Sequence, residues 1–228
     1  MTLMVRRLIM LTPLLLLPLA SSAEEHKGAE PGWDGLVEIE SSNIAAAFID
    51  PEADFSGFKR VEILQPYVAF RSNWLRDQNR SRTRNVRPSD VERIKSDIAS
   101  IFVGVFTERL EAAGYEVVNY ADEDVLVLRP AIIDLDVVAP DVRSPGRSRT
   151  YVADSGAATI FLELFDSVSG DLLGRGIDRR VARRGGGMAV NANRVTNRAD
   201  ARREMRAWAD TLIEFLDQHY IKADAAKN

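Results

Sequence analysis

The sequence predicts an α+β fold in which two main helices pack on one face of a mostly antiparallel sheet. Two long segments carry apolar residues at three- and four-residue spacing, which is typical of helices that bury one side. The segments between them alternate apolar and polar residues, which is typical of strands. We expect a single domain at 45–222, a flexible leader at 24–44 and a disordered tail at 223–228.

The strands are predicted from β-branched composition and alternation. Arg60–Leu64 is the first, and Tyr67–Phe70 resumes the pattern after Pro66. Four more are expected at Tyr115–Val118, Val125–Val138, Ala157–Asp166 and Leu172–Ala182. A hairpin turn is predicted at Asp166–Asp171, where Asp, Ser and Gly cluster between two alternating segments.

Alternation also predicts which side chains of the three longest strands face the core. The expected inner residues are Val125, Val127, Ala131, Ile133, Leu135 and Val137, then Ala158, Ile160, Leu162 and Leu164, then Leu173, Ile177 and Val181. Asp178 and Arg180 are expected on the outer face of the last strand, as in a sheet that faces water on one side.

The first main helix is expected to open at Pro88 and Ser89 and to end at Gly114. Ser89-Asp90-Val91-Glu92 fits a capping box, and glycine favours the left-handed backbone that ends a helix. The second main helix is expected at about Asn197–His219. The predicted buried stripes are Val91, Ile94, Ile98, Ile101, Phe102 and Val105 in the first helix, and Ala201, Met205, Trp208, Leu212 and Phe215 in the second.

The N-terminal segment has the three parts of a secretory signal peptide. Met1–Arg7 is positively charged, Leu8–Leu19 is apolar, and small residues follow. We therefore expect a signal peptide at 1–23, with cleavage between Ala23 and Glu24. The apolar run is shorter than the roughly 20 residues that span a membrane. We expect a periplasmic or otherwise exported protein with no transmembrane segment in the mature chain.

Composition argues against several classes of site. The chain has no cysteine, which excludes disulfides, thiolate metal sites, cysteine nucleophiles and lipid attachment through cysteine. His26 and His219 lie near the two ends, and no nucleophile-elbow or Ser-x-x-Lys motif occurs. We therefore expect no enzyme, no catalytic residue, no metal site and no cofactor. The net charge of −4 argues against general nucleic-acid binding.

The segment Arg71–Arg87 is the candidate binding site. It contains six arginines against one acid, Asp77, and it includes Trp74. The candidate anion-binding residues are Arg71, Arg76, Arg80, Arg82, Arg84 and Arg87. They could meet an anionic lipid or glycan surface or an acidic protein, with Trp74 as an interface anchor. The alternative is an exposed, mobile loop with no specific role, because charge runs are usually solvated.

Two other patterns have simpler interpretations. The glycine-rich Arg183–Arg194 lacks the spacing of a phosphate loop, so we expect a flexible connector. Asp134, Asp136 and Asp141 could hold a hard cation, but they also suit the solvated face of a sheet, which we favour.

Three motifs resemble a bacterial envelope family, domain of unknown function 3313. They are Phe48–Val61 with its Pro-x-x-Asp-Phe-Ser turn, Leu128–Asp134, and Glu163–Leu173 followed by Trp208-Ala209. The resemblance covers most of Ala45–Asp217 and implies an envelope protein with no established catalytic residue. Many members resemble lipoproteins, and this chain departs from them because it lacks the cysteine that would be acylated.

Three hypotheses about function follow. The first is a non-catalytic periplasmic or envelope accessory or binding module, with envelope proteins as partners. The second is binding of an anionic lipid or glycan through the arginine-rich segment. The third is a hydrolase without a recognisable motif, which a pocket with strongly perturbed carboxylates would favour.

Overall fold

The computed structural model describes residues 34–40, 43–80, 86–137, 151–152, 154–183, 190–191 and 194–226. The chain divides into two units, Met1–Glu30 and Pro31–Asn228, and all described residues belong to the second. The predicted cleavage site at Ala23 and Glu24 lies outside the described residues.

The described elements are three α-helices, one 3₁₀ turn and ten strands. The helices are α1 (Trp74–Arg80), α2 (Pro88–Ala112) and α3 (Arg194–Ala226), and the 3₁₀ turn is η1 (Phe55–Gly57). The strands are β1 (Val37–Ile39), β2 (Ala46–Ile49), β3 (Arg60–Ile63), β4 (Tyr67–Phe70), β5 (Glu116–Val118), β6 (Val125–Val137), β7 (Tyr151–Val152), β8 (Asp154–Asp166), β9 (Leu172–Arg183) and β10 (Val190–Asn191).

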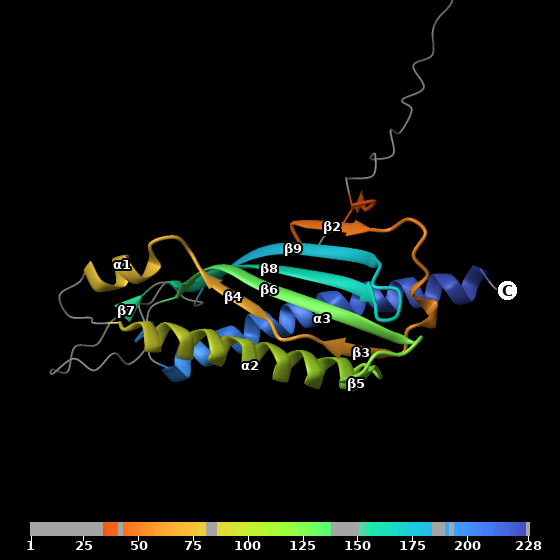
Figure 1. Ribbon diagram of the computed structural model, residues 1–228. Coiled ribbons are helices and arrows are strands. Elements are labelled where there is room, and N and C mark those ends of the chain that lie inside the picture. Colours follow the sequence, from red (N-terminus) through yellow and green to blue (C-terminus); the bar gives the residue numbers. More distant parts are fainter. Residues whose placement is uncertain are drawn as a thin grey trace, which may run out of the picture. The chain divides into compact units, whose positions relative to one another are not determined.

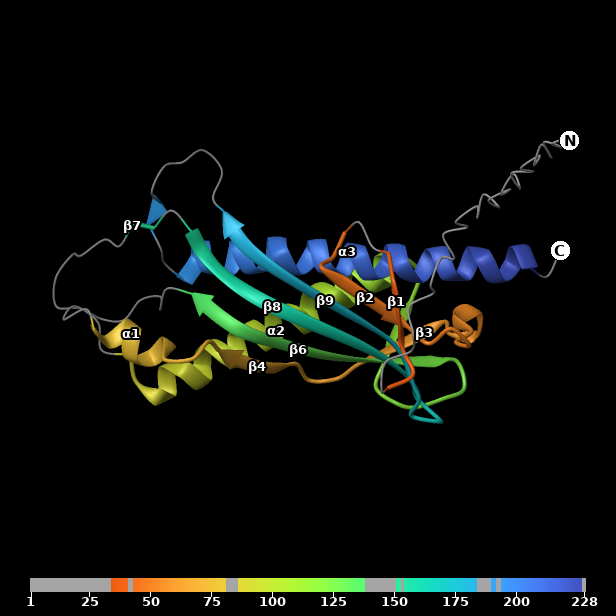
Figure 2. The same cartoon turned by 90° about the horizontal axis from the view of Figure 1, so that it is seen from above.

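Eight strands form one mixed sheet in the order β1-β2-β9-β8-β6-β3-β5, with β4 also paired to β6. The β3–β5, β3–β6 and β4–β6 pairs are parallel and the other pairs of this sheet are antiparallel. Helices α2 and α3 pack together along the same face of the sheet (Figure 1). Seen from above, β6, β8 and β9 lie in front of both helices (Figure 2). The predicted fold class is therefore confirmed.

The core lies between this sheet and the two helices. On α2 the rings of Phe102 and Phe106 are stacked at 3.9 Å and fully buried. On α3 the predicted stripe is confirmed at Met205, Trp208 and Leu212, which are each less than 9% exposed. Burial of these stripes accounts for both helices, because long helices in globular proteins gain most of their stability from packing one apolar face.

The predicted inner face of β6 is wrong over most of its length. Leu126, Leu128 and Ile132 are buried against the helices, whereas Val127 and Ile133 belong to the opposite face. The cause is a β-bulge at Asp134, where φ is 50° and the register with β8 shifts. One extra residue reverses which side chains face the core, so Leu135 is again buried.

The predicted faces of β9 are also reversed around Asp178. Asp178 pairs directly with the buried Ile160 of β8, and Arg180 pairs with Ala158. Both charged residues therefore point toward the helices, and Ile177 points away from them. The reversal is tolerated because Asp178 has polar partners on the helix side, which are described below.

The first main helix begins at Pro88, as predicted, but its cap differs from the predicted capping box. Arg87 is the N-cap of α2 and Pro88 is its first residue, which suits proline because that position needs no amide donor. The Asp90 carboxylate accepts a hydrogen bond of 3.1 Å from the Arg87 amide, so the box uses Asp90 rather than Glu92. The predicted end is confirmed, since Gly114 follows the helix with φ 94°.

Part of the predicted flexible leader is a strand. β1 pairs with β2 in antiparallel register, from Val37 opposite Ile49 to Ile39 opposite Ala47. Asp34 just before it is held by a hydrogen bond of 2.6 Å from Arg175 of β9. The domain therefore starts before residue 45.

Candidate functional site

The space between α3 and the sheet contains two pockets that share one wall, the indole of Trp208. The smaller pocket, of about 90 Å³, lies between the N-terminal halves of α2 and α3. The larger pocket, of about 330 Å³, lies between β2, β9 and the later part of α3. The larger pocket opens where β9 carries a glycine, Gly176, on the side that faces α3.

The wall between the pockets is a small polar cluster in the core. The Trp208 Nε1 group donates a hydrogen bond of 2.8 Å to Asp178 Oδ2, and Arg180 Nε donates one of 2.7 Å to the same oxygen. The Arg180 guanidinium also lies 5.7 Å from the centre of the Trp208 ring. Because Asp178 is only 8% exposed, these contacts supply the partners that a buried carboxylate needs.

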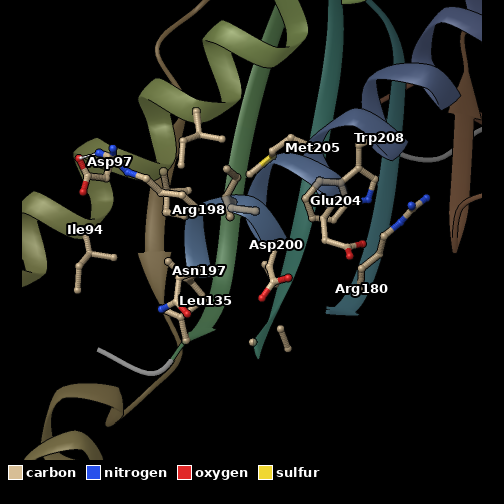
Figure 3. Close-up of a pocket in the computed structure, with 18 residues that line it drawn as sticks. Ile94, Asp97, Leu135, Arg180, Asn197, Arg198, Asp200, Glu204, Met205 and Trp208 are labelled. Carbon is tan, nitrogen blue, oxygen red and sulfur yellow. Dashed lines mark hydrogen bonds and ion pairs between the residues drawn. The ribbon is translucent and has the colours of Figure 1, made fainter. Parts of the chain in front are cut away.

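The smaller pocket has apolar walls and a charged rim (Figure 3). In this view Met205 and Trp208 extend from α3 over the strands, and Arg180 extends toward Trp208. The rim charges are paired: Arg198 contacts Asp97 at 3.2 Å, and Arg203 contacts Asp200 at 3.1 Å. The pocket is suited to a small apolar group rather than to an ion.

The larger pocket is hollow because Gly176 has no side chain. A Cβ atom at this position would lie 3.2 Å from Ile44 Cδ1, which is the nearest atom facing it. The apolar walls come from Ala47, Leu162, Leu212 and Phe215. The pocket is therefore lined by strand and helix residues at fixed positions in the core layer.

The rim of the larger pocket is polar and acidic. Asn43 Nδ2 donates a hydrogen bond of 2.8 Å to Glu214 across it, and Glu40 also lines it. Arg175 is the basic residue among the described residues that line the pocket. Its guanidinium forms ion pairs with Asp34 at 2.6 Å and with Glu163 at 3.0 Å, so its charge is already balanced within the chain. Negative charge at the rim disfavours an anionic ligand and favours a neutral or cationic polar group.

The arginine-rich segment is not an exposed loop throughout, which corrects the prediction. Residues Trp74–Arg80 form α1, and Trp74 is only 1% exposed. The Trp74 Nε1 group donates a hydrogen bond of 2.8 Å to the Val137 carbonyl. The Trp74 ring stacks on the ring of Phe70, with 3.9 Å between the ring centroids. Trp74 therefore anchors α1 to the sheet and is not a surface anchor for a partner.

The candidate arginines fall into three groups. Arg71 is half-buried and pairs with Asp77 and Asp136 at 2.8 Å each, and its hydrogen bond holds the pKa of Asp77 below the usual value. Arg76 and Arg80 are exposed one helical turn apart on α1, and Arg87 is exposed at the start of α2. Arg82 and Arg84 lie outside the described residues.

The structure describes two of the three aspartates that were considered as cation ligands. Asp134 occupies the bulge and Asp136 pairs with Arg71, whereas Asp141 lies outside the described residues. No group of three potential metal-ligating side chains occurs within the described ranges.

Of the predicted glycine-rich connector, residues 184–189 lie outside the described residues. The Asp166–Asp171 turn is confirmed, with Asp166 Oδ1 accepting from the amides of Val168 and Ser169.

Sequence reasoning did not find the pockets. The feature of the sequence that could have revealed the larger pocket is the pair Gly174 and Gly176 in an otherwise regular strand. Glycine inside a strand often marks a site where another group approaches closely. The prediction that Asp178 and Arg180 face water placed Gly176, on the same side of the strand, outside the core as well.

Comparison with solved structures finds distant similarity at low identity. A PelC dodecamer from Paraburkholderia phytofirmans has 10% identity and a TM-score of 0.32, with 67% of this chain and 88% of that chain covered. A Xanthomonas campestris protein of the DUF330 family model has 12% identity and a TM-score of 0.37, with 75% and 88% covered. A neuraminyllactose-binding hemagglutinin homolog from Helicobacter pylori has 14% identity and a TM-score of 0.34, with 77% and 96% covered.

Within the described residues, no helix is both long enough and apolar enough to cross a membrane. A comparison with curated proteins finds no match. The family model described as "Protein of unknown function (DUF3313)" matches residues 29–212. That match includes all three motifs on which the resemblance rested, and the chain therefore belongs to the DUF3313 family.

Proposed function

We propose that this chain is a non-catalytic binding module of the bacterial cell envelope, and that the larger pocket holds the apolar part of an amphipathic ligand. The observation that carries the proposal is the pocket of about 330 Å³ formed over Gly176 between β2, β9 and α3. Its size lies at the lower end of the roughly 300–1,000 Å³ that is usual for small-molecule sites. The signal-peptide pattern at 1–23 supports an envelope location.

The lining indicates the chemical class of the ligand. Ala47, Leu162 and Leu212 offer an apolar surface, which favours an alkyl or aromatic group. Glu40 and Glu214 at the rim favour a cationic or neutral polar end and disfavour a carboxylate or phosphate. The proposed ligand is thus a single short apolar chain with a neutral or positively charged end.

Calorimetric titration with three probes of equal chain length tests this charge preference. Octyltrimethylammonium and octyl glucoside, each below its micelle concentration, are expected to bind the purified protein. Octanoate is expected to bind about tenfold more weakly than the ammonium probe, because it would place a second negative charge beside Glu214. Equal affinity for all three probes, or tighter binding of octanoate, would contradict the proposed rim.

Filling the pocket provides the matched structural test. Gly176→Leu is expected to abolish binding of both favoured probes, because the new side chain occupies the hollow while Ile44 Cδ1, the end of a flexible side chain, moves aside. Gly104→Leu is the control, since Gly104 is exposed on α2 with no atom near its Cβ position. A folded Gly176→Leu protein that binds as well as the control would place the ligand elsewhere.

A second candidate function is supported by α1. Arg76 and Arg80 present two cations on a helix that Trp74 fixes to the core, and this is an arrangement that an anionic lipid or glycan surface could contact. Each basic residue contributes about 1 kcal/mol near an anionic membrane surface. Reversal of both charges should therefore weaken binding by at least about 30-fold.

Cosedimentation with phosphatidylglycerol-containing vesicles measures this contribution. Arg76→Glu/Arg80→Glu is expected to release the protein from these vesicles, and physiological salt is expected to weaken binding of the unmodified protein. The control is Arg202→Glu/Arg206→Glu, which makes the same charge change at the same spacing on exposed residues of α3. Equal loss in both double variants would assign the effect to net charge rather than to α1.

A further inference from the structure

One carboxylate oxygen in the wall of the larger pocket has no hydrogen-bond donor among the described residues. Asp178 lies on β9, is 8% exposed, and lines the larger pocket but not the smaller one. Trp208 and Arg180 both donate to its Oδ2 atom. The contacts of the Asp178 side chain within the described residues all use Oδ2, so Oδ1 is left as an acceptor.

The strand places this oxygen beside the hollow over Gly176. Residues two apart on a strand share a face, so Asp178 and Gly176 both point from β9 toward α3. Opposite Asp178 on β8 is Ile160, which is 1% exposed and also lines the pocket. Oδ1 keeps some accessible surface. Because Trp208 and Arg180 occupy the Oδ2 side, this surface opens into the larger pocket.

The charge of Asp178 is already balanced within the chain. Arg180 Nε lies 2.7 Å from Oδ2, and the Arg180 guanidinium extends toward the Trp208 ring (Figure 3). A second cation at Oδ1 would lie close to this guanidinium and would be repelled by it. An uncharged donor such as a hydroxyl group avoids that repulsion. The pocket wall therefore favours a hydroxyl group over an ammonium group at this oxygen.

We propose that Asp178 determines the specificity of the larger pocket, and that its Oδ1 atom accepts a hydrogen bond from a hydroxyl group of the ligand. This inference rests on the proposed function, because it concerns the same pocket. It narrows the ligand class to an apolar chain that carries an uncharged donor inside the pocket. The neutral or cationic end of the ligand still lies at the rim, beside Glu214.

The physical reason is the cost of a buried acceptor that loses its contact with solvent. A wholly apolar chain that fills the pocket displaces water from Oδ1 and offers no donor in exchange. A hydroxyl group replaces that water with a hydrogen bond to a charged acceptor, which is stronger than a bond between neutral groups. Sites with a buried polar group therefore discriminate strongly against ligands that lack its counterpart.

A matched pair of probes tests the need for a donor. Hexanol and hexyl methyl ether share one chain, but methylation of the oxygen removes the O–H donor and leaves an acceptor. Dissociation constants are measured from the shift of the Trp208 indole N–H signal in a nuclear magnetic resonance titration. Hexanol is expected to bind at least about tenfold more tightly, which corresponds to about 1.4 kcal/mol. Because the ether has the larger apolar surface, burial alone predicts the opposite order.

Asp178→Asn is expected to remove or reverse this preference. The asparagine oxygen can still accept from Trp208 and Arg180, which leaves the amide N–H group at the position of Oδ1. That group donates to the ether oxygen, so hexyl methyl ether should bind at least as tightly as hexanol. A steric obstacle to the ether would give no such recovery.

Thr211→Val is the matched control for a polar group in the same pocket wall. The Thr211 hydroxyl already donates to the Ala207 carbonyl at 3.0 Å, within α3. Its removal should leave the order of the two probes unchanged. Loss of the preference for hexanol in Thr211→Val, with the preference retained in Asp178→Asn, would assign the donor to Thr211 and overturn the proposal.

The orientation of bound hexanol supplies a measurement that needs no variant. Nuclear Overhauser contacts are expected from the hydroxyl-bearing methylene to the Trp208 ring. The terminal methyl group is expected to contact Phe215, which lies about two turns further along α3. The reverse orientation, or equal affinity for both probes in the unmodified protein, would overturn the role of Asp178.

A parallel titration with octyltrimethylammonium separates this inference from the proposed function. Binding of octyltrimethylammonium without any preference for hexanol over the ether would overturn the inference alone. The same holds if octyltrimethylammonium binds and hexanol does not. A Trp208 signal that no probe shifts would overturn both, because the pocket itself would then bind none of these chains.

Discussion

Replacement of Trp208 by alanine is expected to lower the free energy of unfolding by about 3–5 kcal/mol. The side chain is 3% exposed, it lies in the main core cluster, and it forms the wall between the two pockets. The substitution removes a large buried ring and also removes the indole donor from Asp178, which is itself buried. Loss of packing and loss of the hydrogen bond act in the same direction.

Chemical denaturation measures this loss, and a second variant separates its two parts. Trp208→Phe keeps most of the packing but removes the N–H donor, so it should cost about 1–3 kcal/mol. Arg180 still binds Asp178 in that variant, which keeps the penalty below that of an isolated buried charge. An unchanged denaturation midpoint for Trp208→Ala would show that the wall between the pockets is not part of the core.

Trp74→Ala is expected to have the second largest effect, about 3 kcal/mol, at the low end for a buried aromatic ring. Trp74 is the centre of a smaller cluster with Val86 and Ile94, separate from the main core. Its loss should detach α1 from the end of β6, because the bond to the Val137 carbonyl and the stack on Phe70 disappear together. The effect should therefore be partly local.

Limited trypsin digestion combined with denaturation distinguishes local from global loss. Cleavage after Arg76 and Arg80 should accelerate in Trp74→Ala, while the arginines of α2 stay protected until the whole domain unfolds. Val168→Ala is the control, because Val168 is 66% exposed in the β8–β9 turn and should cost little. Unchanged cleavage at Arg76 and Arg80 would contradict the anchoring role of Trp74.

The parts of the fold that follow local periodicity could be predicted from the sequence. Met205, Trp208 and Leu212 recur at helical spacing, and this spacing correctly predicted the buried side of α3. Ile160 and Leu164 recur at strand spacing, and this spacing correctly predicted the buried side of β8. Gly114 likewise marks the end of α2 with a positive φ. These signals lie within a few residues of each other and need no knowledge of the partner element.

The errors arose where a distant contact overrides the local pattern. A single left-handed residue, Asp134, changes which side of β6 faces the core, and aspartate gives little warning of this in a β-branched segment. Asp178 faces inward because Trp208, thirty positions later, supplies a donor. Trp74 folds a charged segment into α1 through contact with Val137 of β6.

The candidate site was harder to predict than the fold because a pocket is defined by what is missing. The larger pocket forms over Gly176 because β2 and α3 lie on two sides of this glycine. Both of these neighbours are distant from Gly176 in the sequence. The arginines, by contrast, were conspicuous in the sequence, yet Arg71 serves an internal pair with Asp77 and Asp136. Only Arg76, Arg80 and Arg87 are exposed among the candidates that the structure describes.

The most direct test of the proposed function is a nuclear magnetic resonance titration that observes the indole N–H signals. Trp208 lines the larger pocket, whereas the Trp74 indole donates to Val137 in a separate cluster and serves as an internal reference. Addition of octyltrimethylammonium is expected to shift the Trp208 signal in a saturable manner and to leave the Trp74 signal in place. The same titration of Gly176→Leu should shift neither signal. A Trp208 signal that stays fixed in the unmodified protein at saturating probe, or one that moves together with that of Trp74, would contradict ligand binding between α3 and the sheet.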